Sequence, residues 1–166
     1  MSTMDTAATH LPSTKEIKDL LDGLLGREVQ LTPTSLLTPS ASSPRSVAVY
    51  VDDRLAVRAV AACDLAFSAH AGAALALIPA PTAEEAIEAN RLDDSLTENL
   101  NELLNVVASL FNVPHAAHVR LHELHPAGPP LPPHVQSRML TLGRREDLEV
   151  SIAGYGSGLF SLIICA

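Results

Sequence analysis

Four polar residues of two alternating types occur at helical spacing within residues 97–112: Glu98, Asn101, Glu102 and Asn105. In a helix these positions share one face, because residues three or four apart are neighbours. A carboxylate pairs with cations, whereas a carboxamide both donates and accepts hydrogen bonds. Asn is a poor choice for a helix face that is merely solvated, because it costs several tenths of a kcal/mol relative to Ala. The pattern therefore indicates either a chemical site or a solvated face, with or without a partner contact.

The opposite side of the same segment is apolar. Its residues are Leu96, Leu100, Leu103, Val107 and Leu110, broadened by Leu104, Val106 and Phe111. A stripe of this kind faces a core. Asp93 and Asp94 suit the positive end of a helix dipole, and Pro114 cannot continue a helix. The spacing predicts an amphipathic helix that begins near residue 93 and ends before residue 114.

The segment NELLNVVASLFN resembles the helix signature of the CheC/CheX/FliY family of chemotaxis phosphatases, D/S-x3-E-x2-N with a Pro about twenty residues later. Glu102 and Asn105 match its Glu and Asn, and Pro126 lies close to its Pro. Glu98 stands where the family has Asp or Ser, and Asn101 occupies a position that is usually small.

A second register is also open. Asp94, Glu98 and Asn101 match the D/S-x3-E-x2-N part literally, but their flanking residues fit the family less well. The Glu102/Asn105 register is preferred, with Glu98 and Asn101 as the alternative. The opening helix, the hairpin, the Ala-rich helix before the motif helix and the closing strands also follow the family's order.

The resemblance implies a hydrolase that acts on the aspartyl phosphate of a CheY-type response regulator. The receiver would supply Mg²⁺ and a Lys, so this chain itself would bind no cofactor. Asn105 would orient the attacking water, and Glu102 would pair with the receiver's Lys. The alternative is a non-catalytic relative that docks a receiver or a flagellar switch component.

Composition limits the other classes of function. The chain has 166 residues, 47% of them hydrophobic, and a formal net charge of −8. That charge disfavours nucleic acids and anionic membranes as partners. The first residues have neither the basic nor the apolar region of a signal peptide, so we expect a cytoplasmic protein.

The local patterns predict an α+β domain over residues 13–166, with a largely antiparallel sheet packed against long helices, and a disordered arm over residues 1–12. Helices are expected at 13–26, from Asp64 to before Pro79, from Thr82 to about Asn90, and at the motif. Capping boxes are expected at Ser13 with Glu16 and at Thr82 with Glu85, and Asp64 is expected to cap the helix that it begins. Strands are expected at 29–31, 47–51, 55–61, 117–122, 148–153 and 159–165, with a loop over 32–46. No internal repeat is evident.

Two further hypotheses come from the same reading. His115, His118, His122 and His125 could hold a metal or could line an exposed strand, and the absence of Cys or Asp among them favours the strand. The apolar C-terminal strand, if it lies at a sheet edge, would need covering, which predicts a homodimer. Cys63 and Cys165 form no motif, and their pairing stays open.

Overall fold

The computed structural model describes residues 7–35 and 44–165, and its strands form one antiparallel sheet in the order β1-β5-β6-β3-β2-β4. The elements are α1 (Thr14–Leu25), β1 (Val29–Pro33), β2 (Arg45–Val51), β3 (Val57–Asp64), α2 (Leu65–Leu75), α3 (Ala80–Ala89), α4 (Asp94–Val107), the 3₁₀ turn η1 (Ala108–Leu110), β4 (Arg120–His125), α5 (Pro133–Met139), β5 (Arg145–Ile152) and β6 (Gly156–Ile164). The predicted α+β class with an antiparallel sheet is confirmed.

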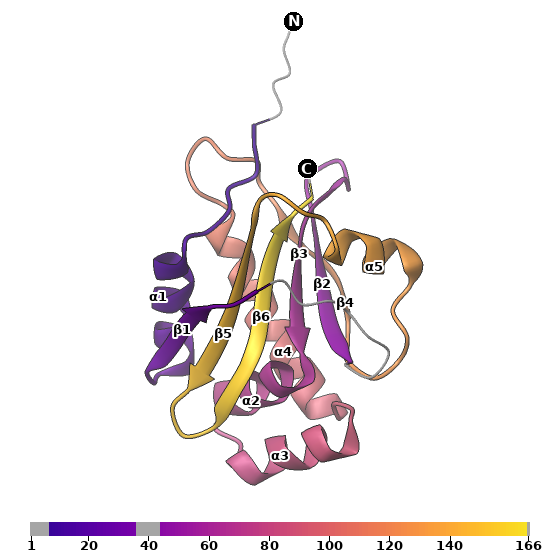
Figure 1. Ribbon diagram of the computed structural model, residues 1–166. Coiled ribbons are helices and arrows are strands. Elements are labelled where there is room, and N and C mark those ends of the chain that lie inside the picture. The colour runs from indigo at the N-terminus through magenta and orange to yellow at the C-terminus, as the bar shows by residue number, and fades with distance from the viewer. Residues whose placement is uncertain (1–6, 36–43, 166) are drawn as a thin grey trace, which may run out of the picture.

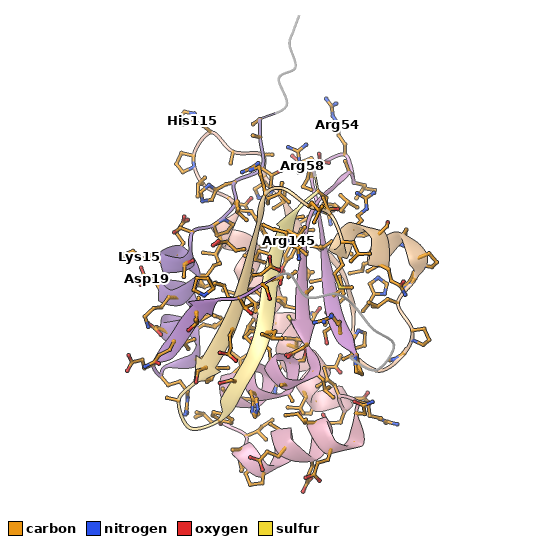
Figure 2. The ribbon with its side chains drawn as sticks, in the orientation of Figure 1. Lys15, Asp19, Arg54, Arg58, His115 and Arg145 are labelled. Atoms are coloured by element: carbon orange, nitrogen blue, oxygen red, sulfur yellow. The ribbon has the colours of Figure 1, made fainter. Side chains whose placement is uncertain are left out.

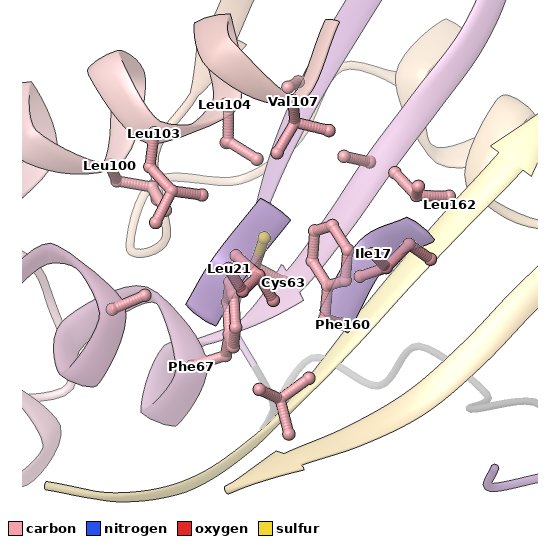
Figure 3. Close-up of a cluster of buried hydrophobic side chains, with 14 of the residues drawn as sticks. Ile17, Leu21, Cys63, Phe67, Leu100, Leu103, Leu104, Val107, Phe160 and Leu162 are labelled. Carbon is pink, nitrogen blue, oxygen red and sulfur yellow. The ribbon is translucent and has the colours of Figure 1, made fainter. Parts of the chain in front are cut away.

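The sheet carries helices on both faces. The main core lies between the sheet and the helices α1, α2 and α4, and it includes Phe67, Leu100 and Phe160 (Figure 3). The helix α5 covers the other face of the sheet (Figure 1), where its residues Val135 and Met139 form a smaller cluster with side chains of β2, β3 and β6. Because α2 is buried on almost every side, it is nearly all Ala, Leu and other small or apolar residues.

The topology contains an internal two-fold arrangement. If β1 is exchanged with β4, β2 with β5 and β3 with β6, the strand order becomes the same order read in reverse. Each half begins with a helix and contributes three strands, although α5 is inserted between β4 and β5 in the second half. The first strand of each half pairs with the second strand of the other. The helices α1 and α4 are therefore equivalent in position, a relationship that the sequence did not reveal.

Three of the predicted helix starts are confirmed by their caps. Ser13 forms the predicted capping box with Glu16, Asp64 accepts from the N–H of Phe67, and Asp93 accepts from the N–H of Leu96. The predicted capping box at Thr82 is wrong. The helix α3 begins at Ala80, after Pro79, and has no side-chain cap. Pro81, the second residue of α3, fits this first turn because the N–H that it lacks has no partner there.

The second half of the chain departs further from the prediction. The predicted strand at 117–122 lies at Arg120–His125, and the helix α5 was not foreseen. The C-terminal strand β6 lies between β5 and β3, so the condition under which it would need covering by a second chain is not met; the edges of the sheet are β1 and β4. The homodimer stays a prediction without that argument. Cys63 belongs to the core on the α1, α2 and α4 side, whereas Cys165 packs on the α5 side, so the sheet separates them.

Part of the stretch for which we expect disorder contacts the domain. Thr9 is 1% exposed, and its hydroxyl accepts from Nε of Arg58 at 3.0 Å. Arg144 donates to the carbonyl oxygen of Thr9, and the N–H of Ala117 donates to that of Ala8. Residues 8 and 9, which precede the predicted start of the domain, thus pack against it. Residues 1–6 lie outside the described part, as do residues 36–43 of the predicted loop.

None of the helices in the described ranges is long and apolar enough to cross a membrane.

Candidate functional site

The motif helix α4 is fixed along its whole length by burial of one face. Leu96, Leu100, Leu103, Leu104 and Val107 are buried, and Figure 3 shows the last four of these pointing into the core. Deleting any one of these leucine side chains would cost about 2–5 kcal/mol. The helix is therefore a rigid platform for whatever its other face presents.

The four predicted site residues all lie on that other face. Glu98, Asn101, Glu102 and Asn105 are exposed. Within the described residues none of them makes a hydrogen bond or an ion pair to another side chain or to the backbone. The structure thus brings both registers together as one continuous polar strip rather than separating them.

The C-terminal end of α4, next to Asn105, is held by a tyrosine from the sheet. The N–H of Ala108 donates to the carbonyl oxygens of Asn105 and Val106, in the tighter turn that leads into η1. The carbonyl of Leu104 thus lacks its usual partner four residues on. The hydroxyl of Tyr50, in β2, donates to it at 2.7 Å. Burial, and to a smaller extent Cys63, raises the pKa of Tyr50 well above its ordinary value, so this donor stays protonated.

A second contact fixes α4 against α2. Asn99 donates to the carbonyl oxygen of Gly72 at 3.0 Å. A Cβ atom at Gly72 would lie 2.9 Å from the carbonyl oxygen of Leu96, so only glycine allows the two helices to approach this closely. Asn99 is thus a structural residue, although it lies between the exposed residues of the strip.

An open groove runs between α4 and the edge strand β4. Its volume is about 570 Å³, and it is lined by Thr97, Glu98, Asn99, Asn101, Glu102 and Leu124. Asn105 lies outside this lining. The groove gives the polar strip an asymmetric setting, with one side beside the sheet edge.

The histidine-rich segment is divided between a loop and a strand. His115 and His118 lie in the loop after η1, whereas His122 and His125 lie in β4. Across the described residues, no group of three or more His, Cys, Asp or Glu side chains is placed to hold a metal. Asn112, which also belongs to the motif segment, exchanges two hydrogen bonds with the backbone of Val119 and ties this loop to the helix end.

Sequence reasoning missed Tyr50 and Gly72. A signal for Tyr50 was present, since it is the one residue with a polar group in the buried run Val47–Val51, and a buried Tyr hydroxyl needs a partner. The partner itself, 54 residues away, could not be named.

No family model and no curated protein matches the chain. Solved structures do match. The FliM middle domain from H. pylori has a TM-score of 0.58 at 11% identity, covering 91% of this chain and 84% of that one. FliY from Thermotoga maritima gives 0.56 at 15%, covering 90% and 82%. A chain of the FliG–FliM complex from H. pylori gives 0.53 at 9%, covering 94% and 88%. The fold is that of the CheC/CheX/FliM fold family, as predicted.

Proposed function

We propose that the protein is a phosphatase that hydrolyses the aspartyl phosphate of a CheY-type receiver to the free carboxylate and inorganic phosphate. One observation carries this proposal: Glu102 and Asn105 lie side by side and exposed on the outer face of a helix whose other face is buried. A rigid helix edge with two free polar side chains can enter a shallow site on another protein.

The proposed hydrolysis requires few catalytic groups from this chain. A phosphorylated receiver already holds Mg²⁺ and a Lys against the phosphoryl group, so the missing part is a water molecule held in line with the bond that breaks. The carboxamide of Asn105 can both accept from and donate to that water, and it adds no negative charge beside the anionic phosphoryl group. Glu102 pairs with the receiver's Lys and sets the register of the two proteins.

A non-catalytic docking module is the second candidate. The exposed strip continues to Asn101 and Glu98, beyond the pair that the chemistry needs. A protein of the same fold has also been solved in a FliG–FliM complex. In this alternative the whole strip is a contact surface for a receiver or a switch component, and Asn105 has no special role.

The deciding experiment measures phosphate release from Mg²⁺-loaded, phosphorylated CheY-type receivers of the same organism. We expect acceleration by the wild-type protein and a loss of about a hundredfold or more in Asn105→Ala, because the water is no longer positioned. Asn101→Ala is the matched control, with the same side chain removed one turn earlier on the same face. If Asn101→Ala alone abolishes the rate, the alternative register with Glu98 is correct. Binding without acceleration for every receiver would establish the docking module.

A further inference from the structure

The two equivalent helices α1 and α4 differ in whether their acidic side chains form ion pairs. On α1, Lys15 pairs with Asp19 at 2.7 Å (Figure 2). Lys18 pairs with Asp22 at 2.9 Å, and the partners in each pair are four residues apart. The helix α4 contains no Lys or Arg. Within the described part of the chain, no cation pairs with Glu98 or Glu102.

The carboxylates of Glu98 and Glu102 are four residues apart, so they are neighbours on the helix surface and repel one another. On α1 the chain neutralises such charges with its own lysines. On α4 the charges of Glu98 and Glu102 have no such lysine partner among the described residues, and they lie next to the residues of the proposed site. The unbalanced charge is complementary to a cation from outside this chain.

The lining of the groove beside these carboxylates combines acidic, polar and apolar surface. Its lining combines Glu98 and Glu102 with the polar side chains of Thr97 and Asn101, and Leu124 of β4 adds apolar surface. Lysine and arginine side chains have an apolar stem that packs on hydrocarbon and a charged head that stays with polar groups. A bare metal ion would make no use of Leu124.

We propose that this groove receives a Lys or Arg side chain from the surface of the partner protein, with Glu98 as the residue that selects for it. This inference rests on the proposed function, in which a receiver docks on α4. The groove contact is additional to the one between Glu102 and the Lys at the phosphorylated site. It assigns a role to Glu98, where the family signature has Asp or Ser.

The test separates binding from chemistry. Receivers activated with beryllofluoride and Mg²⁺ are titrated against the wild type and Glu98→Gln at low and high salt, and the KM and kcat for phosphate release are measured in parallel. We expect Glu98→Gln to weaken binding and raise KM roughly two- to fivefold at low salt, with kcat unchanged. The difference should shrink at high salt, because the contact is partly exposed.

Glu149→Gln is the matched control. Glu149 is exposed on β5, and both variants change the net charge by the same amount. An equal effect of both variants would reduce the result to net charge and overturn the groove contact. If Glu98→Gln binds receivers as tightly as the wild type, the groove contact is also overturned, even if Asn105→Ala abolishes catalysis. Weakened binding by Glu98→Gln without any phosphatase activity would uphold the groove and reject the phosphatase. No binding by any receiver would reject both.

Discussion

The hydroxyl of Tyr50 donates a 2.7 Å hydrogen bond to the carbonyl oxygen of Leu104, the residue immediately before Asn105. This contact connects the C-terminal end of β2 to the point where α4 tightens into η1. The ring of Tyr50 also packs against Phe111, with 5.1 Å between centroids. The position of Asn105 relative to the sheet is therefore set by one buried donor as well as by the apolar face of the helix.

Replacing Tyr50 with Phe should lower both stability and activity. The change leaves the buried carbonyl of Leu104 without a partner, which costs about 1–3 kcal/mol. For a chain of this length that corresponds to a fall in Tm of roughly 2–4 °C per kcal/mol. We expect kcat of the proposed phosphatase to fall as well, because the helix end beside Asn105 is no longer held. Urea unfolding and phosphate release measure the two effects.

Tyr155→Phe is the control for this variant. Its hydroxyl also donates to a backbone carbonyl at 2.7 Å, but that of Ile78, which lies in the link between α2 and α3 rather than at the end of α4. It should lose stability while kcat stays at the wild-type value. Equal losses of kcat in both variants would mean that general destabilisation, rather than the position of Asn105, limits the rate.

Replacing Gly72 with Ala should push α2 and α4 apart. The added Cβ would lie 2.9 Å from the carbonyl oxygen of Leu96, and both groups belong to packed helices, so we expect a loss of about 1–3 kcal/mol. Gly23→Ala is the matched change in α1, where nothing lies within 4 Å of the new atom. It should stabilise by about 0.5–1 kcal/mol. Thermal unfolding distinguishes them, and a neutral Gly72→Ala would contradict the close approach of the two helices.

Much of the fold could be predicted because its signals are local. The caps at Ser13, Asp64 and Asp93 and the apolar stripe of α4 depend on residues within a few positions of one another. Strand order depends on contacts between distant segments. Periodicity describes β6 equally well as an edge or a central strand, since a strand buried on both faces reads as an unbroken apolar run.

The candidate site divides in the same way. The exposure of Glu98, Asn101, Glu102 and Asn105 follows from the 3.6-residue period alone. The groove requires Leu124, which pairing with β2 brings beside α4. The contact between Tyr50 and Leu104 requires the sheet and the helix to be packed first. Sequence thus predicted which residues are presented, and not what surrounds them.

The buried pair of Arg145 and Asp147 should make the fold sensitive to acid. The two side chains are 10% and 11% exposed, their charged groups form two hydrogen bonds, and Ser161 donates to the same carboxylate. Burial alone would raise the pKa of Asp147, but the hydrogen bonds from Arg145 and Ser161 outweigh it, and the pKa lies below its ordinary value of 3.8. The stabilisation is thus complete above pH 3.8 and is lost as the pH falls through the lower, folded-state pKa.

Asp147→Asn tests this pair. It should cost about 3 kcal/mol at neutral pH, because it leaves the Arg145 charge buried without its partner. It should also remove the part of the acid dependence that lies below pH 3.8. Asp19→Asn breaks the exposed pair with Lys15 and should change little. Equal effects of the two variants in urea titrations would contradict the importance of burial.

His70 should add a separate pH dependence at milder acidity. It lies in α2, is 6% exposed, and packs its ring against Gly156; within the described residues its Nδ1 has no hydrogen-bond partner. Burial lowers the pKa of His70, and the nearby carboxylates of Glu84 and Asp64 oppose that effect only in part. The unfolded chain therefore takes up a proton near pH 6.5 while the folded chain does not. Stability is complete above that pH and falls as the pH drops toward the folded-state pKa.

In His70→Gln the free energy of unfolding should vary less between pH 7 and pH 5 than in the wild type. His134→Gln, which changes an exposed histidine of α5, should keep the wild-type slope. If the slope of His70→Gln matches the wild type, then His70 is not the group that takes up the proton on unfolding.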